Sequence, residues 1–284
     1  MDWLRPAVAA LAALAFALPA AAQKDRGYEP RVGQAGKDVK WLPTPDKVVD
    51  IMLRMAQVTP ADTVVDLGAG DGKIAIAAAK KFGARALGIE YNPDMARYAQ
   101  RNVERAGVAA RARIVQGDIF ATDYSQATVV TMYLLPELNL KLRPTILAMR
   151  PGTRVVSYVY DMDDWEPDEV SDLNGPGRRG NFAYFWVVPA RVSGSWTLEL
   201  AGAAARPKLS LTQRHQKIGG TVDLGSALLV GLREPRLSGT RIAFAYVDKQ
   251  GVRRDFSGRV SGTRMQGTFR ADGGGEGRWT AAKR

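Results

Sequence analysis

The sequence of 284 residues contains no cysteine and only one histidine, His215. The lack of cysteine excludes disulfide bonds, metal–thiolate sites and thiol nucleophiles. A single histidine does not make a metal site, so we interpret His215 as structural and expect no metal. After residue 22 no convincing apolar run approaches the ~20 residues that a membrane-spanning helix needs. We therefore expect no transmembrane span beyond that point.

Residues 1–22 have the features of a secretory signal peptide. Arg5 precedes an apolar run from Ala7 to Leu18, and the small residues Ala20 and Ala22 form an A-x-A cleavage pattern. The sequence predicts export to a periplasmic or other extracytoplasmic location, with an uncleaved leader acting as an anchor as the alternative. Residues 23–40 are polar and glycine-containing, and we expect a flexible linker there.

The most informative motif is a glycine loop after the apolar run Thr63–Val65. The loop reads Asp66-Leu67-Gly68-Ala69-Gly70-Asp71-Gly72, and a helical pattern, Lys73–Phe82, follows at once. Glycine lets the backbone turn tightly and approach a ligand, and the first turn of a helix presents free N–H groups. Such a loop marks a nucleotide-type site at the carboxyl end of a strand. An NAD fingerprint is disfavoured because its third small position falls on Lys73.

Alternating strand and helix patterns continue to residue 188, as a parallel, doubly wound sheet requires. The expected strands after the glycine loop are Ala86–Glu90, Arg113–Asp118, Ala127–Leu135, Arg154–Tyr160 and Phe182–Val188. Glu90 ends its strand twenty positions after Gly70. An acid at that spacing can accept hydrogen bonds from both ribose hydroxyls of a nucleoside.

The D-x-G-x-G-x-G loop resembles motif I of the class I S-adenosylmethionine-dependent methyltransferases. The resemblance implies a Rossmann-like, seven-stranded α/β methyltransferase sheet over residues 41–189, with Phe182–Val188 as a reversed edge strand. It implies S-adenosylmethionine as the cofactor. The cofactor contacts expected from the family are Asp66, Gly68, Gly70, Gly72 and Glu90, together with Asp118 and its neighbour Ile119 near the adenine.

Two further elements narrow the resemblance. Trp41-Leu42-Pro43-Thr44-Pro45 precedes an amphipathic helix, and Tyr133-Leu134-Leu135-Pro136 follows the fourth strand. Together they resemble small protein-lysine methyltransferases related to the mitochondrial enzymes that act on the adenine nucleotide translocase and on the c subunit of the ATP synthase. The resemblance implies a protein substrate, a lysine acceptor, and Thr44 as a contact from a lid over the cofactor. An ordinary proline-rich entry to a helix is the alternative interpretation of Thr44.

Candidate acceptor-side residues are Tyr133 and the acidic loop Asp161–Trp165. Both follow strands at the same predicted rim of the sheet. We hypothesise that Tyr133, Asp163 and Asp164 form the catalytic, substrate-facing surface, where the acids would attract a basic acceptor. The alternative is a solvated acidic loop.

Residues 190–284 have a different pattern, with short alternating strands separated by turns, which predicts a smaller antiparallel β domain, a barrel or sandwich, with seven expected strands. This part holds 17 Lys and Arg against 7 Asp and Glu, whereas residues 1–190 hold 23 against 22. Such a domain could contact an acidic protein or an anionic surface. The domain lacks a run of aromatic residues interleaved with its arginines, so we expect no nucleic-acid stacking platform and no sequence-specific nucleic-acid binding. A generally basic, solvated surface is the alternative.

The sequence thus predicts an S-adenosylmethionine-dependent methyltransferase acting on a protein side chain, with lysine as the first choice. The alternative is an exported S-adenosylmethionine- or nucleoside-binding or interaction protein that keeps the methyltransferase fold without transfer activity. The predicted export favours the alternative, because S-adenosylmethionine is a cytosolic metabolite. The complete set of loop glycines and of Asp66, Glu90 and Asp118 favours the enzyme.

Overall fold

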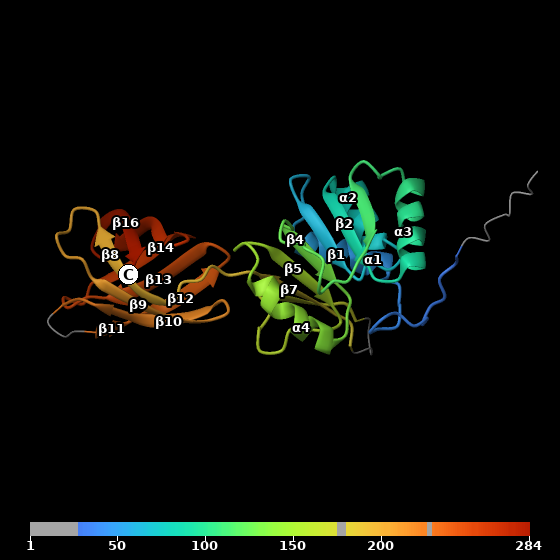
Figure 1. The fold of residues 1–284 in the computed structure, drawn as a ribbon. Coiled ribbons are helices and arrows are strands. Elements are labelled where there is room, and N and C mark those ends of the chain that lie inside the picture. The colour runs from blue at the N-terminus through green and yellow to red at the C-terminus, as the bar shows by residue number, and fades with distance from the viewer. Residues whose placement is uncertain (1–27, 175–179, 226–228) are drawn as a thin grey trace, which may run out of the picture.

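The computed structural model describes residues 28–174, 180–225 and 229–284. The predicted leader, residues 1–22, lies outside the described residues. Figure 1 shows an elongated molecule made of an α/β body, residues 41–188, and a β body, residues 190–284, with the N-terminal segment at the end away from the β body. Within the described ranges, no helix has the length and apolar character needed to cross a membrane.

The α/β body is built on a sheet of seven strands in the order β3-β2-β1-β4-β5-β7-β6. The strands are β1 (Thr63–Leu67), β2 (Arg85–Glu90), β3 (Ala112–Gln116), β4 (Val129–Met132), β5 (Arg154–Tyr158), β6 (Glu169–Asp172) and β7 (Phe182–Val187). Strands β1 to β5 are parallel, and β7 runs against both of its neighbours, β5 and β6. The predicted Rossmann-like methyltransferase sheet is therefore confirmed.

One detail of the predicted sheet was wrong. The reversed strand β7 lies inside the sheet, and β6 forms the edge. Strand β6 is four residues long and mostly exposed, with the sequence Glu-Val-Ser-Asp. Such a short, polar edge strand lacks the apolar alternation that identifies strands in a sequence.

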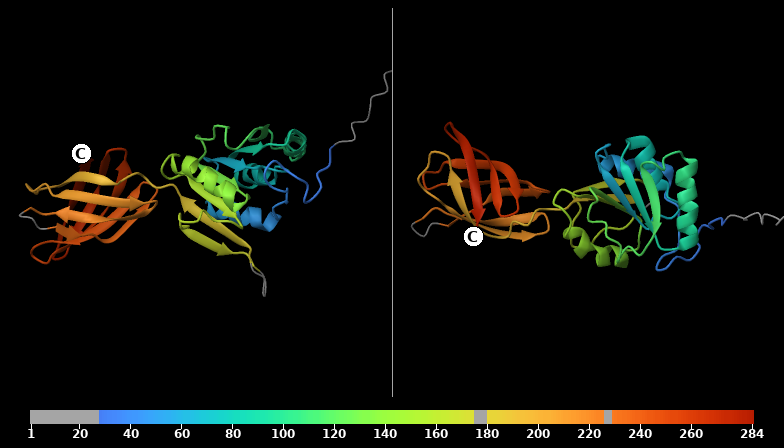
Figure 2. Two further views of the ribbon diagram at one scale, coloured as in Figure 1. Left: turned by 60° about the horizontal axis from the view of Figure 1, so that its bottom comes forward. Right: turned by 45° about the horizontal axis from the view of Figure 1, so that its top comes forward.

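Four helices cover the two faces of this sheet: α1 (Asp46–Met55), α2 (Lys73–Phe82), α3 (Pro93–Arg105) and α4 (Pro136–Leu147). Neighbouring residues of β1 show the division between the faces. Val64 packs in one core with α1, α2 and α3, whereas Val65 packs in the other core with α4. Because both faces are covered, β1 is apolar on both sides, as a parallel strand should be. Figure 2 shows α4 on its own side of the sheet.

The β body is an antiparallel sheet of nine strands in the order β11-β10-β9-β8-β16-β15-β14-β13-β12. They are β8 (Gly194–Leu200), β9 (Lys208–Arg214), β10 (Lys217–Asp223), β11 (Leu229–Gly231), β12 (Arg233–Ser238), β13 (Arg241–Val247), β14 (Arg253–Ser261), β15 (Arg264–Ala271) and β16 (Gly275–Lys283). The sheet curls into a nearly closed barrel around an aromatic core that includes Trp196, Phe244, Phe256 and Trp279.

The structure adds two strands, β11 and β12, to the seven that the sequence predicts in the β body. Strand β12 contains Pro235, and its pairing with β13 is irregular between Arg233 and Arg236. Proline and a bulge interrupt the alternation of apolar and polar residues, which hides the strand from sequence analysis.

The β body joins the α/β body at the end of the sheet that lies away from the glycine loop. The last residue of β7, Val187, pairs with Arg154, the first residue of β5. The chain therefore leaves the sheet at the amino ends of its parallel strands, whereas the glycine loop follows the carboxyl end of β1. The N–H of Ala190 donates to the carbonyl oxygen of Gly239 at 2.8 Å and fixes the start of the β body.

Candidate active site

The glycine loop between β1 and α2 has the backbone conformation that its glycines predict. Gly68, Gly70 and Gly72 have φ angles of +78°, +52° and +81°. A Cβ on Gly70 would lie 2.5 Å from Nε1 of Trp41, so a side chain there would collide with the indole. A Cβ on Gly72 would instead face Ala99 and Ile114. Gly68 and Gly70 line a pocket, while Gly72 allows the close packing of α2 and α3.

The N–H groups of this loop are used inside the protein. Those of Gly68 and Ala69 both donate to the carbonyl oxygen of Ile89, at 2.9 and 3.0 Å. The N–H of Gly70 donates to Oε2 of Glu90 at 2.9 Å. These residues precede α2, so the prediction that the first turn of the helix presents free N–H groups is not tested by them. The loop brings bare backbone close to the pocket and holds Glu90 in place.

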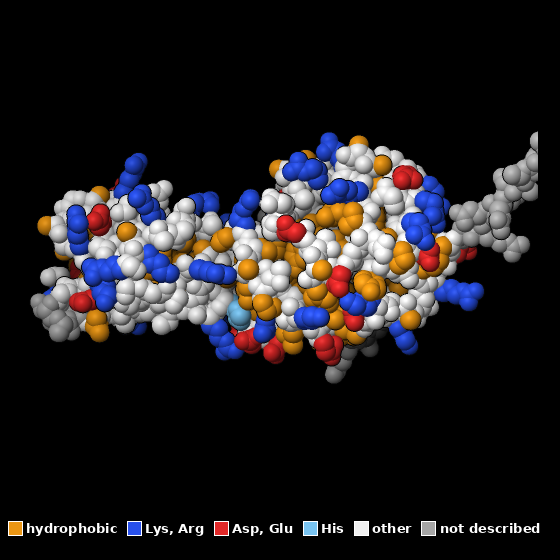
Figure 3. Space-filling model, in the orientation of Figure 1, with side chains coloured by type: hydrophobic (Ala, Val, Ile, Leu, Met, Phe, Trp, Pro, Cys, Tyr) orange, Lys and Arg blue, Asp and Glu red, His pale blue; other side chains and the backbone are white. Residues whose placement is uncertain are grey.

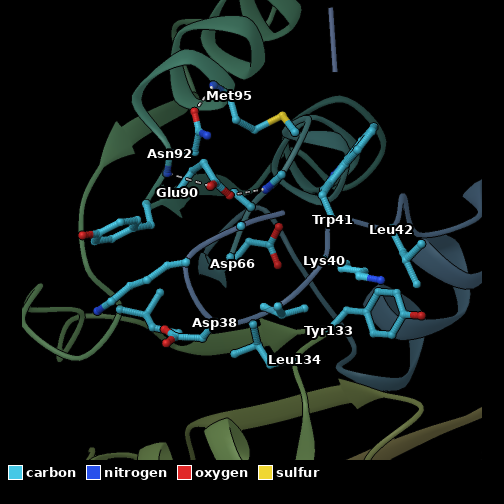
Figure 4. A pocket seen from close by; sticks show the side chains of 18 of the residues that line it. Asp38, Lys40, Trp41, Leu42, Asp66, Glu90, Asn92, Met95, Tyr133 and Leu134 are labelled. Carbon is cyan, nitrogen blue, oxygen red and sulfur yellow. Dashed lines mark hydrogen bonds between the residues drawn. The ribbon is translucent and has the colours of Figure 1, made fainter. Parts of the chain in front are cut away.

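The pocket has a volume of about 460 Å³ and lies at the carboxyl ends of β1, β2 and β4. Ligand sites of small molecules have volumes of this order. The predicted site residues that line it are Thr44, Asp66, Gly68, Gly70, Glu90, Asp118, Ile119 and Tyr133. In the view of Figure 4, Glu90 and Tyr133 lie at opposite ends with Asp66 between them. The predicted residues Gly72, Asp163 and Asp164 are not among the residues that line the pocket.

Glu90 connects the glycine loop to the start of α3. Besides the bond from Gly70, its Oε1 accepts from the N–H of Asn92 at 2.9 Å, and Asn92 in turn caps α3. Burial raises the pKa of Glu90, while the N–H donors of Asn92 and Gly70 act in the opposite direction. The carboxylate is thus held rigidly by backbone donors, and its other lone pairs can serve a ligand.

Asp66 is the most deeply buried carboxyl group of the pocket, with 3% of its surface exposed. Its Oδ1 accepts a hydrogen bond of 2.8 Å from the hydroxyl of Thr131, which stands beside it in register on β4. Burial, opposed by the hydrogen bond from Thr131 and assisted by the neighbouring Asp71 and Glu90, raises the pKa of Asp66 to about 7. Burial also raises the pKa of Asp71. Burial thus disfavours the ionised forms of Asp66, Asp71 and Glu90. A positively charged ligand would stabilise these ionised forms, so the pocket favours such a ligand.

Residues 34–44, which we call the strap, form one wall of the pocket. The N–H of Trp41 donates to the carbonyl oxygen of Gln34 at 2.9 Å, and Ala35 forms a β-bridge with Lys40. Residues 34–40 were expected to belong to a flexible linker, so that expectation is corrected here. Thr44 is buried, and its carbonyl oxygen accepts from Nζ of Lys73 at 3.0 Å.

The strap is tied to Asp118, the acid at the exit of β3. Nζ of Lys37 lies 2.8 Å from Oδ2 of Asp118 and 4.8 Å from the centre of the Tyr91 ring. The hydrogen bond from Lys37 holds the pKa of Asp118 below its ordinary value. Lys37 and Asp118 are 81 positions apart in the sequence, so no local pattern predicted this pair.

The end of the pocket around Tyr133 is aromatic. The Tyr133 ring lies 4.7 Å from that of Tyr158, measured between ring centres, and Tyr160 also lines the pocket. Burial raises the pKa of the Tyr133 hydroxyl, with smaller contributions from Tyr158 and Tyr160. Leu134 and Leu135 line the same cavity. Tyr158 and Tyr160 were predicted only as strand residues, because the turn of the chain after β5 is not visible in the sequence.

Asp164 lies where the α/β body meets the β body. Its carboxylate pairs with Arg143 of α4 and with Arg214 at 2.8 Å, and it lies 3.5 Å from Nε2 of His215. The hydrogen bond from Arg214, followed by the charge of Arg143, lowers the pKa of Asp164 to about 2. The His215 ring packs 6.0 Å from that of Trp165.

Asp163 has a φ of +55°, and its N–H donates to Oδ1 of Asp161 at 3.1 Å. The structure therefore places Asp164 in the contact between the two bodies and Asp163 in the turn next to it, instead of on the pocket wall.

The residues of the pocket fit S-adenosylmethionine. Glu90 offers carboxylate oxygens for ribose hydroxyls, and Asp66 and Asp71 offer negative charge for a cationic methionine group. Gly70 leaves space that a Cβ would fill. The aromatic end around Tyr133 is suited to an apolar or cationic acceptor.

Comparisons with known proteins agree with this assignment. The family model of the ANTKMT methyltransferase domain matches residues 66–169. A protein-lysine N-methyltransferase of Saccharolobus islandicus is 45% identical over 152 residues, which cover 53% of this chain and 94% of that protein. The Mus musculus lysine N-methyltransferase for the c subunit of ATP synthase is 29% identical over 181 residues, covering 60% of this chain and 72% of that protein.

A solved structure gives a further match. The crystal structure of an RNA methyltransferase from Salinibacter ruber, in complex with S-adenosyl-L-homocysteine, is 47% identical with a TM-score of 0.50. It covers 53% of this chain and 96% of that chain. Each of these three matches covers 60% of this chain or less.

Proposed function

The chain belongs to the family of the protein-lysine N-methyltransferases, and from this premise we propose that it methylates the side-chain amine of a lysine in a protein substrate. It is an S-adenosylmethionine-dependent methyltransferase, as the family and the related structure with bound S-adenosyl-L-homocysteine show. The observation that carries the proposal is the pocket itself. It combines a carboxylate-lined part, with Asp66 and Glu90, and an aromatic part, with Tyr133.

The proposed cofactor site extends from the strap to β4. Glu90 would hold the ribose, Asp118 and Ile119 would lie beside the adenine, and Asp66 would face the positive charge of the methionine part. Gly68 and Gly70 would allow the backbone to approach closely, and Thr44 of the strap would cover the site. When bound, S-adenosylmethionine supplies an electrophilic methyl group, so the protein residues need only to bind, orient and exclude water.

An acceptor lysine has to lose its proton before it can act as a nucleophile. The aromatic end of the pocket supports this step, because transfer of an ammonium group into an apolar surrounding lowers its pKa. Tyr133 and Tyr160 would also line the alkyl chain of the lysine. We therefore propose Tyr133 as a substrate-facing residue. The position of Asp163 and Asp164 between the two bodies does not support our hypothesis of a catalytic role for them.

RNA is the second candidate acceptor. The Salinibacter ruber protein is described as an RNA methyltransferase, and residues 191–284 carry a net charge of +10, from 17 basic and 7 acidic residues. A basic surface binds nucleic acid without sequence preference. Protein-lysine methylation is favoured because two relatives, including the one at 45% identity, act on lysine. The comparisons do not favour the alternative of a binding protein without transfer activity.

The test separates the acceptors directly. The full chain is incubated with methyl-labelled S-adenosylmethionine and either a cell-envelope protein fraction or total RNA. We expect label that protease removes and ribonuclease does not. A Glu90→Ala variant, checked for folding by circular dichroism, is the control and should transfer little label. Label found only in RNA would replace the lysine proposal by the RNA proposal. Absence of label in both fractions, with intact cofactor binding, would point to the inactive binding protein.

The leader and the two bodies lead to two further proposals. We propose that residues 1–22 direct export and that residues 41–189 and 190–284 are separate domains. Fractionation with N-terminal sequencing tests the first: a mature protein beginning at Gln23 outside the cytoplasm is expected. Recovery of the uncleaved chain in the cytoplasm would contradict it.

A further inference from the structure

Four arginines stand on one face of the β body. In β13, Ile242 and Phe244 point into the core, so Arg241 and Ala243 point outward. The same alternation and the strand register place Arg236 of β12, Arg259 of β14 and Arg278 of β16 on this outer face. We call these four residues, Arg236, Arg241, Arg259 and Arg278, the arginine face. They line a shallow depression of about 900 Å³.

The register gives the depression its shape. One row across the strands reads Arg236, Ala243, Ser257, Thr268, Arg278. Short side chains thus lie in the middle and arginines at both ends, four strand spacings or about 19 Å apart when followed along the curved sheet. A second row reads Ser238, Arg241, Arg259, Gln266, Thr280. Its two arginines stand directly opposite each other on β13 and β14.

Like charges in directly opposite positions destabilise a sheet unless an anion lies near them. Within the described part of the chain, none of the four arginines forms an ion pair with an acidic side chain. Other arginines of the same sheet do: Arg253 pairs with Glu234 and Asp255, Arg254 pairs with Asp248, and Arg270 pairs with Glu276. Arg253, Asp255, Arg270 and Glu276 point to the same side of the sheet as the arginine face. The lack of an acidic partner therefore distinguishes the four arginines around the depression from the paired arginines beside them. Figure 3 shows many basic and few acidic side chains over the visible side of the β body.

The groups on this face suit an anion that binds through hydrogen bonds and charge, without stacking of a base or insertion of an apolar group into a bilayer. A guanidinium binds a carboxylate or phosphate through two parallel hydrogen bonds, and Ser257 and Thr268 add hydroxyl donors. Large exposed apolar side chains in the described ranges are Val32, Leu42, Tyr91, Leu135, Leu140, Val170 and Leu229, all outside β12 to β16. The face thus offers no apolar anchor for a bilayer and no ring for stacking a base.

We propose that the arginine face binds an acidic segment of a polypeptide, rich in Asp and Glu, and so recruits a protein substrate. The choice of a protein rests on the proposed function. The β body is attached at the end of the sheet away from the glycine loop, so the face captures the substrate at a distance from the pocket. Binding there raises the local concentration of acceptor lysines at the pocket.

The test measures binding of a fluorescent oligoglutamate peptide to the full chain by anisotropy, without S-adenosylmethionine. The variant is Arg241→Gln together with Arg259→Gln. Its matched control is Lys208→Gln together with Lys249→Gln, which also removes two positive charges from the β body but lies outside the depression. We expect the arginine variant to bind at least about tenfold more weakly, because two bidentate contacts are lost. The control should change affinity by less than about twofold, because distant charges are screened.

Equal affinity of the arginine variant and the wild-type chain would overturn the proposal. Tighter binding of oligouridylate or of phosphatidylserine vesicles than of oligoglutamate would also overturn it, in favour of RNA or a membrane. The result does not depend on catalysis. Methylation of a short lysine peptide without acidic residues should be equal in the arginine variant and the wild type, so a failure of the proposed function is recognised separately.

Discussion

Burial of the ionised Asp66 carboxylate lowers the free energy of unfolding, and the Asp66→Asn variant should show by how much. Burial raises the pKa of Asp66 from 3.8 to about 7. The folded state therefore binds a proton more tightly than the unfolded state, and stability falls as pH rises from about 4 to about 7. At ~1.4 kcal/mol for each pH unit, the full effect is about 4 kcal/mol.

Asp66→Asn removes the ionisation and keeps an oxygen that can accept from Thr131. We expect this variant to be more stable than the wild type by up to about 4 kcal/mol at pH 8, but by only about 1 kcal/mol at pH 4.5. Urea denaturation at the two pH values measures this difference. Groups that titrate alike in the wild type and in Asp66→Asn contribute equally to both proteins, so their contributions cancel in the difference. The variant should bind S-adenosylmethionine more weakly, because the cationic cofactor loses a negative neighbour. An Asp66→Asn protein that is less stable at pH 8, or equally more stable at both pH values, would show that ionisation of Asp66 does not destabilise the fold.

Three further variants test the ribose contact of Glu90, the close packing at Gly70 and the contact of Asp164 between the two bodies. Glu90→Ala leaves the N–H groups of Gly70 and Asn92 without their acceptor and should weaken S-adenosylmethionine binding at least about tenfold, measured by calorimetry; unchanged binding would contradict the ribose contact. Gly70→Ala combines a φ of +52° with a collision against Trp41 and should destabilise by more than the ~1–2 kcal/mol of backbone strain alone. Gly107→Ala is its control, because Gly107 has a φ of +71° with no heavy atom near the Cβ position; equal thermal shifts would show that the Trp41 contact is unimportant. Asp164→Asn removes the pairing with Arg214 and should increase the radius of gyration in X-ray scattering while leaving S-adenosylmethionine binding unchanged; an unchanged scattering profile would refute its role between the two bodies.

The sequence predicts those parts of the site in which the local backbone conformation restricts the residue type. Gly68 and Gly70 are recognisable because their conformation and the space at Gly70 require glycine. Glu90 is recognisable because a strand of the sheet ends there, at a fixed spacing from the loop. These features need only a few neighbouring residues, so their pattern survives in the linear sequence.

Contacts between distant segments were not predicted. The strap looks like a linker, because its polar residues become a pocket wall only through Lys37 and Asp118, which are 81 positions apart. Asp164 looks like a substrate-facing acid, because its partner Arg214 lies 50 positions further along the chain. Likewise, the arginine face appears only when the register of β12 to β16 brings its members together. Charge alone predicted a basic domain, but not which of its arginines lack an acidic partner.

Methyl transfer to lysine can be observed by mass spectrometry. The full chain is incubated with S-adenosylmethionine carrying a deuterium-labelled methyl group and a cell-envelope protein fraction, and peptides are then sequenced. We predict labelled methyl groups on lysine side chains in the reaction with wild-type protein, and their absence in the reaction with Glu90→Ala. Unlabelled lysines in a reaction with a wild-type chain that binds S-adenosylmethionine would contradict the claim.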